Sequence, residues 1–148
     1  APELANRVEL LQDWSQIAFL SVESGRVERW YRSGALLIGD AAHTMSPVAG
    51  VGINYAIQDA VVAANLLSQP LKSGAVKVTD LAKVQHQREL PTRIIQGFQS
   101  IVQNRIVAQA LATNNTEFKL PWLMRLPWFR YLPPRLIGLG VFPVRVRC

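Results

Sequence analysis

The chain has 148 residues, 49% of them hydrophobic, and a formal net charge of +6 at pH 7, which suits one domain with a sizeable core. Its one cysteine, Cys148, excludes an intramolecular disulfide, which is typical of a reducing compartment, and we expect a cytoplasmic protein. The sequence contains no apolar run of 18 residues, so it predicts no membrane-spanning helix.

The first third of the chain predicts a helix followed by two short strands. Residues 1–16 place leucine and valine side chains at helical spacing. The stretches at residues 17–22 and 27–31 predict strands, and the Ser-Gly pair at residues 24–25 between them is a turn signal. We therefore expect a hairpin that turns at this pair.

The most informative stretch runs from residue 35 to residue 54. Residues 35–38 are a short apolar run that predicts a buried strand, which Gly39 ends. Asp40 follows at once, and ligands of open α/β sheets bind outside the carboxyl ends of strands, where a carboxylate can accept hydrogen bonds from ligand hydroxyls. Gly50 and Gly52 permit a tight turn and close approach of a ligand. A helix is expected to begin near Gly52, and its free N–H groups would suit an anionic or electron-rich ligand.

Residues 53–68 predict a largely buried helix. Ala56, Ala60 and Ala64 share one face, where small side chains permit close packing against a sheet. The Ser-Gln-Pro sequence at residues 68–70 is expected to end this helix.

A second helix is predicted from the N-cap candidates Thr79 and Asp80 to about Leu111. Pro91 is expected to kink or divide it, because proline lacks an N–H and clashes with the preceding turn. Further on, Leu-Pro motifs recur at six-residue spacing within residues 120–133 and predict short helical turns between prolines.

The positive charge is concentrated at the C-terminal end. Residues 119–148 contain six basic residues and no acidic residue, whereas the ten basic and ten acidic residues elsewhere balance. Such a segment can contact nucleic acid or an anionic membrane surface, pair with acidic residues of a missing domain, or remain a solvated edge. We expect no nucleic acid partner.

The sequence G-D-A-A-H-x-x-x-P-x-x-G-x-G-x-N at residues 39–54, followed by A-I-Q-D-A, resembles the second flavin motif of the FAD-dependent aromatic hydroxylases. These are class A flavoprotein monooxygenases of the para-hydroxybenzoate hydroxylase type. The resemblance is gapless over residues 39–60 and continues more weakly to about Val146. Gln85 stands where the family usually has tyrosine, and residues 137–141 resemble the family's closing glycine-rich stretch.

The resemblance implies a mostly helical α/β fragment. It would comprise the C-terminal part of a Rossmann-like FAD-binding domain and the last strands of a substrate-domain sheet. Residues 1–33 would end the substrate domain and form the crossover hairpin. Residues 34–112 would complete the FAD-binding domain, and residues 113–148 would form a basic tail rich in proline and tryptophan.

The resemblance also implies a flavin site. Asp40 would bind the ribityl hydroxyl region of FAD, and residues 47–54 would pass along the isoalloxazine ring. The implied cofactor-binding residues are Gly39, Asp40, Pro47, Gly50, Val51, Gly52, Ile53 and Asn54. We expect no catalytic side chain and no metal site, and we interpret His43 as a locally hydrogen-bonded loop residue, because the flavin carries the chemistry.

The reaction that the resemblance implies is hydroxylation of an aromatic or related small organic substrate. NADH or NADPH would reduce FAD, and dioxygen would then give a C4a-hydroperoxyflavin that transfers an oxygen atom. A helix N-terminus stabilises an anionic reduced flavin by up to ~2 kcal/mol, or roughly 40 mV for a two-electron couple.

The sequence lacks a G-x-G-x-x-G motif, which would hold the FAD pyrophosphate. We therefore expect the chain to be the C-terminal portion of a longer enzyme. It would be inactive alone, and a missing N-terminal FAD-binding segment would be its partner.

Two alternatives remain open. A flavin-dependent reductase or halogenase of the same superfamily would carry its distinguishing residues outside this chain. A truncated, non-enzymatic protein would instead bind a partner or a membrane through the basic, tryptophan-rich tail. Flavin absorbance distinguishes this last class, because such a protein would be colourless.

Overall fold

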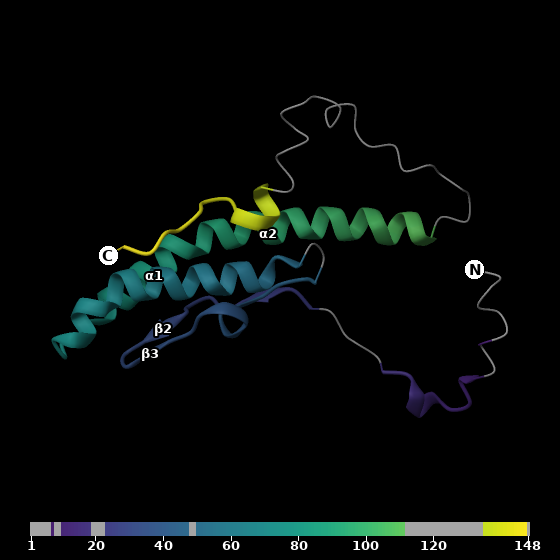
Figure 1. The fold of residues 1–148 in the computed structure, drawn as a ribbon, viewed down its shortest axis with the longest axis horizontal. Coiled ribbons are helices and arrows are strands. Elements are labelled where there is room, and N and C mark those ends of the chain that lie inside the picture. Colours follow the sequence, from purple (N-terminus) through teal and green to yellow (C-terminus); the bar gives the residue numbers. More distant parts are fainter. Residues whose placement is uncertain (1–6, 8–9, 19–22, 48–49, 112–134, 148) are drawn as a thin grey trace, which may run out of the picture.

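The computed structural model describes residues 7, 10–18, 23–47, 50–111 and 135–147, and for residues 105–111 it describes the backbone alone. Two helices dominate it: α1 spans Gly52–Lys72 and α2 spans Val78–Leu111. Figure 1 shows them side by side, with the hairpin of β2 and β3 on one side and the C-terminal segment on the other. The described residues are thus mostly helical, with small antiparallel sheets, as expected for an α/β fragment.

In the described residues, the strands form two short antiparallel pairs. β1 (Gly25–Arg26) pairs with β4 (His43–Thr44), and β2 (Tyr31–Arg32) pairs with β3 (Ala35–Leu36). The second pair is a hairpin whose turn contains Gly34 at a φ of 76°, a conformation that glycine adopts without steric cost.

The hairpin predicted around residues 24–25 is wrong in the described residues. Gly25 lies within β1 and pairs with Thr44, so the chain does not turn there. The buried strand predicted over residues 35–38 shortens to β3 and is only half-buried. The reason is that the turn at Gly34 folds β3 back onto β2, and no parallel strand flanks β3 in the described part of the chain.

The helix predicted over residues 1–16 is not present in the part that is described. A 3-10 turn, η2 (Trp14–Gln16), is found there instead. The Asp13 carboxylate accepts a hydrogen bond from the backbone N–H of Ser15 at 2.7 Å, and the Gln16 side chain accepts from the Asp13 N–H at 3.4 Å. This capping box gives backbone N–H groups of the turn local hydrogen-bond partners. The turn therefore forms without being continued as a longer helix.

α1 begins at Gly52, as predicted, but it runs past the predicted end at residues 68–70 to Lys72. Pro70 lies in the last turn. The stop signal is Gly74, with a φ of 66°, and the N–H of Ala75 donates to the Pro70 carbonyl at 2.9 Å. This left-handed cap satisfies the last carbonyls of the helix, so glycine and not proline ends it.

The buried face of α1 differs from the predicted one. Tyr55, Asp59 and Val62 are buried, whereas Ala60 and Ala64 are exposed. The neighbour of α1 here is α2, with which it makes its most extensive contact. The expected burial of an alanine face against a sheet is therefore not found in the described residues.

α2 continues to Leu111, as predicted, and it is not divided at Pro91. Its start differs from the prediction, because Thr79 lies inside the helix. The Asp80 carboxylate reaches back to accept from the Lys77 N–H at 3.2 Å. Asp80 thus caps the helix from its first turn.

The C-terminal segment, residues 135–147, lies along α1. Residues 135–139 form a helical turn. Three side-chain amides of α1 donate to backbone carbonyls of the segment at 2.8 to 3.1 Å: Asn54 to Ile137, Gln58 to Leu139, and Asn65 to Arg145. The repeated Leu-Pro motifs lie outside the described residues.

Two apolar clusters form much of the core in the described part of the chain. The first contains Met45, Val51, Tyr55 and Ile95, and the second contains Val62, Leu67, Leu81 and Val84. Leu136 and Ile137 of the C-terminal segment cover the first cluster, and Val144 covers the second. None of the described helices is long and apolar enough to cross a bilayer.

Candidate functional site

The predicted flavin motif begins at a tight turn on α1. Gly39 opens the 3-10 turn η3 (Gly39–Ala41), is buried, and has a φ of 58°. A Cβ atom at this position would lie 3.0 Å from the Cβ of Ala56, so the backbone of η3 rests directly on α1. Only glycine combines this conformation with this close approach.

A buried carboxylate fixes this turn. Asp59 of α1 accepts a hydrogen bond from the Gly39 N–H at 3.0 Å, and the same oxygen lies 2.6 Å from Nε2 of His43. Its other oxygen accepts from Nε of Arg88 in α2 at 2.7 Å. Asp59, His43 and Arg88 are each no more than 1% exposed, so three separate elements meet at one carboxylate.

The electrostatics of this network favour the charged form of Asp59. Burial would raise the pKa of the carboxyl group, but hydrogen bonds from His43, Arg88 and the Gly39 N–H outweigh burial and lower it below its ordinary value. Arg88 also stands over the ring of Tyr55, at 5.3 Å from the ring centroid. Burial raises the pKa of Tyr55, although the Val141 N–H and Arg88 act in the opposite direction.

His43 has the local hydrogen bond that the sequence suggested, but it lies in β4 and not in a loop. Its ring packs against Trp30 at a centroid distance of 5.0 Å. Because a carboxylate only accepts, Nε2 of His43 carries the proton of this hydrogen bond. His43 therefore has a structural role: its contacts with Asp59 and Trp30 help to hold the turn.

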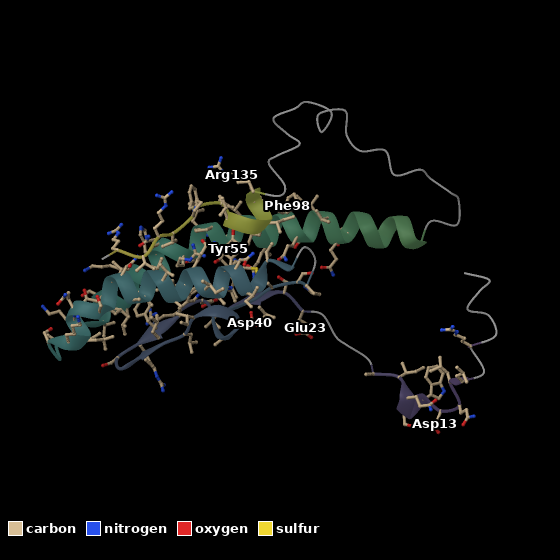
Figure 2. The ribbon with its side chains drawn as sticks, viewed as in Figure 1. Asp13, Glu23, Asp40, Tyr55, Phe98 and Arg135 are labelled. Carbon is tan, nitrogen blue, oxygen red and sulfur yellow. The ribbon has the colours of Figure 1, made fainter. Side chains whose placement is uncertain are left out.

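The eight predicted cofactor-binding residues fall into three classes of exposure. Exposed are Asp40, Pro47, Gly50 and Ile53; half-buried are Gly52 and Asn54; buried are Gly39 and Val51. Val51 belongs to the core and Asn54 holds the C-terminal segment, so both have structural roles in this chain. In Figure 2, Asp40 lies on the strand side of α1, opposite Tyr55.

The N-terminus of α1 lacks a side-chain cap. Its N-cap residue is Val51, and its first turn contains no acidic residue. Gly50 precedes it at a φ of 61° and donates from its N–H to the Pro47 carbonyl at 3.0 Å. A Cβ at Gly52 would meet only an ordinary contact, 3.5 Å from the Cβ of Met45. Internal packing therefore does not require Gly52, and the uncapped N–H groups suit an electron-rich ligand.

These features fit part of a flavin site. An exposed carboxylate, a glycine turn and an uncapped helix N-terminus are donor and acceptor groups of the kind that ribityl hydroxyls and the polar edge of an isoalloxazine ring require. No group of three or more potential metal-ligating side chains occurs in the described residues.

Sequence reasoning missed a buried polar face on α2. It comprises Gln85, Arg88, Thr92, Gln96 and Gln99. Gln85 binds the backbone of Trp30 and Glu28, and Gln96 donates to the carbonyls of Gly25 and Thr44. Polar residues spaced three and four apart were the available signal, since that spacing places them on one helical face.

Comparison with known proteins identifies the family. The model for the FAD binding domain matches residues 1–96, which include the whole motif at residues 39–54. The chain is 38% identical over 148 residues to 6-methylpretetramide 4-monooxygenase of Streptomyces rimosus, covering 99% of this chain and 35% of that protein.

Two fungal relatives come from Penicillium brasilianum. The FAD-dependent monooxygenase prhF is 32% identical over 123 residues, which are 83% of this chain and 23% of the relative. The FAD-dependent monooxygenase ausM is 31% identical over 133 residues, or 88% and 25%. The chain thus spans about a third or less of the length of these relatives. It belongs to the FAD binding domain family, with FAD-dependent monooxygenases as its relatives.

Proposed function

We propose that this chain contributes one side of the FAD site of a monooxygenase that uses NADH or NADPH and dioxygen. The observation that carries the proposal is that the motif contains both an exposed Asp40, on a turn fixed by Asp59, and the uncapped N-terminus of α1. The proposed substrate is an aromatic or related small organic molecule, since one relative is named for its action on 6-methylpretetramide.

Each residue has a defined task in this proposal. Asp40 accepts hydrogen bonds from ribityl hydroxyls, and Gly50 and Gly52 let the backbone approach the ring. The N-terminus of α1 favours negative charge on the ring by up to ~2 kcal/mol. When bound, FAD supplies the redox and oxygen-transfer chemistry.

The network behind the turn has a positioning task. Asp59 holds the Gly39 N–H and is itself held by Arg88 and His43, so the turn that carries Asp40 is fixed from α1, α2 and β4. A preorganised acceptor loses less free energy on binding than a mobile one. The buried carboxylate thus supports binding without contact with the cofactor.

We further propose that residues outside this chain hold the pyrophosphate and adenine of FAD. The sequence contains no G-x-G-x-x-G motif, and the chain covers 35% of the monooxygenase from Streptomyces rimosus. We also propose that the basic tail, residues 113–148, contacts a membrane surface and that the protein is cytoplasmic.

Flavin content tests the proposed function. The purified protein that contains this chain should be yellow, oxidise NAD(P)H and consume dioxygen in step with hydroxylated product. NAD(P)H oxidation without oxygen transfer would favour the reductase, and a halogenated product would favour the halogenase. A colourless protein that takes up no FAD would favour the non-enzymatic alternative.

A further inference from the structure

Three glutamines of α2 hold the segment that leads into the candidate flavin turn. Gln96 and Gln99 are buried, and Gln103 is half-buried. They lie three and four residues apart, so their side chains share one face of the helix. This face bonds to residues 44–46, which immediately precede Pro47. α2 therefore contacts the motif at the point where the chain enters the turn closed by the Gly50 N–H and the Pro47 carbonyl.

Each glutamine makes a different hydrogen bond with this segment. The side-chain amide of Gln96 donates to the Thr44 carbonyl at 3.0 Å, and that of Gln99 donates to the Ser46 carbonyl at 2.7 Å. The Ser46 hydroxyl group donates to Oε1 of Gln103 at 3.0 Å. Two backbone carbonyls and one hydroxyl group of the segment are thus bound from a single helix face.

The same segment packs against the start of α1. Met45 belongs to the apolar cluster that contains Val51 and Ile95, and a Cβ at Gly52 would lie 3.5 Å from the Cβ of Met45. Residues 44–46 are therefore held by α2 on one side and rest on the first turn of α1 on the other. Ser46 is buried, so a substitution that breaks its bond to α2 removes a hydrogen bond from a buried polar group.

We propose that Gln96, Gln99 and Gln103 are positioning residues of the flavin site. They fix the turn that begins at Pro47 relative to the uncapped N-terminus of α1, and they act through residues 44–46. The inference rests on the proposed function, because it assigns these glutamines a task in FAD binding. A turn that is already fixed loses less free energy on binding the ring. A helix N-terminus stabilises negative charge only over a short range, so the ring must be held close to it.

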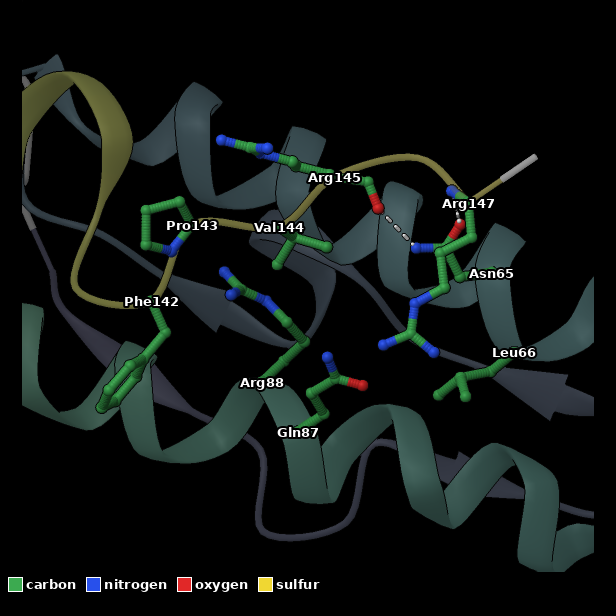
Figure 3. A pocket seen from close by; sticks show the side chains of 9 residues that line it. All are labelled: Asn65, Leu66, Gln87, Arg88, Phe142, Pro143, Val144, Arg145 and Arg147. Carbon is green, nitrogen blue, oxygen red and sulfur yellow. Dashed lines mark hydrogen bonds between the residues drawn. The ribbon is translucent and has the colours of Figure 1, made fainter.

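Gln87 is a matched control on the same helix. Figure 3 shows it at a cavity of about 340 Å³ that lies between α1, α2 and the C-terminal segment. It is exposed and precedes Gln96 by nine residues, which is about 14 Å along a helix. A substitution of Gln87 therefore changes a glutamine of α2 without changing the contact with residues 44–46.

The FAD affinity and the flavin midpoint potential of the protein that contains this chain test the proposal. Gln99→Met removes the donor to the Ser46 carbonyl but keeps a side chain of similar length. It should raise the dissociation constant for FAD about tenfold, which corresponds to the loss of one hydrogen bond. It should also make the midpoint potential more negative, because the N-terminus of α1 would stabilise the reduced flavin less. Gln87→Met should change neither property.

Substitutions of Gln103 test the hydrogen bond itself. Gln103→Glu keeps an acceptor for the Ser46 hydroxyl group and should retain the wild-type FAD affinity. Gln103→Met removes the acceptor and should weaken FAD binding. Urea denaturation of each variant without FAD measures stability separately. A role in the fold alone would lower stability and leave the affinity and the potential of the flavin unchanged.

The possible failures can be told apart. If the wild type binds FAD and Gln99→Met keeps both its affinity and its midpoint potential, the positioning role is wrong and the proposed function stands. If Gln99→Met does not fold, the Gln103 pair decides, and equal FAD affinity of Gln103→Glu and Gln103→Met would overturn the inference. A wild-type protein that takes up no FAD would overturn the proposed function and this inference with it.

Discussion

Arg88 donates from Nε to Oδ1 of Asp59 at 2.7 Å, and this ion pair is fully buried between the two helices. Through the other oxygen of Asp59, the pair reaches the backbone N–H of Gly39, where the predicted flavin motif begins. The packing of α2 on α1 and the shape of the candidate site therefore depend on the same carboxylate. This relationship generates the first two predictions.

Asp59→Asn should lower the free energy of unfolding by about 3–5 kcal/mol, because it leaves the Arg88 charge buried without its partner. Urea denaturation followed by tryptophan fluorescence measures the loss. Asp80→Asn is the control, since the Asp80 partner Lys83 is 64% exposed and solvent weakens that pair. Equal losses in the two variants would contradict the role of the buried network.

Acid pH should reduce the contribution of Asp59. Its pKa in the folded state lies below the ordinary value, so its stabilisation is complete above the unfolded-state pKa of about 4 and is lost as pH falls through the lower folded-state value. The difference in unfolding free energy between the wild type and Asp59→Asn should be constant from about pH 5 to pH 7 and should shrink below about pH 4. A difference that persists or grows in acid would be inconsistent with a stabilising carboxylate.

Gly140→Ala should detach the C-terminal segment from α1. Gly140 has a φ of 75°, and a Cβ there would lie 2.8 Å from Nε2 of Gln58, an atom that holds the segment. The left-handed conformation alone costs an alanine about 1–2 kcal/mol.

Gly138→Ala is the matched control for this prediction, because a Cβ at Gly138 meets no atom within 4 Å. Limited proteolysis should cut the segment faster in Gly140→Ala and at the wild-type rate in Gly138→Ala. Identical cleavage rates in all three proteins would argue against the close packing of Gly140 on Gln58.

The isolated 148-residue chain should bind FAD weakly or not at all and should not oxidise NAD(P)H. It provides no proposed contact for the pyrophosphate or adenine. Ile53, Ile57 and Leu71 of α1 are also 56% to 70% exposed, which favours aggregation. FAD titration monitored by flavin fluorescence measures this directly. Stoichiometric micromolar binding together with NAD(P)H turnover would show that these residues form a complete flavoenzyme.

The parts of the fold that the sequence predicted correctly are those governed by local signals. Gly52 marked the start of α1 because glycines and an apolar helix follow one another there. Pro70 misled the prediction of the helix end. A proline in the last turn disturbs the helix little, and the left-handed Gly74 provides the cap that ends it.

The parts that the sequence did not predict depend on pairings between distant residues. Gly25 reads locally as a turn residue, and only its partner Thr44, nineteen positions on, makes it part of a strand. The ion pair of Asp59 and Arg88 likewise joins two helices. A search for apolar periodicity does not detect it, because both residues are charged. For the candidate site, the motif identified Gly39 and Asp40, but not the carboxylate that holds their turn.

Flavin affinity of an Asp40→Ala variant tests the central claim most directly. Asp40 is exposed, so its removal should leave the fold intact while it takes away a charged acceptor worth about 1.5–3 kcal/mol. In the protein that contains this chain, the dissociation constant for FAD should rise about ten- to a hundred-fold. Asp80→Ala, which removes a carboxylate at the start of α2, should leave it unchanged. Equal FAD affinity of wild type and Asp40→Ala would remove Asp40 from the site and contradict the account.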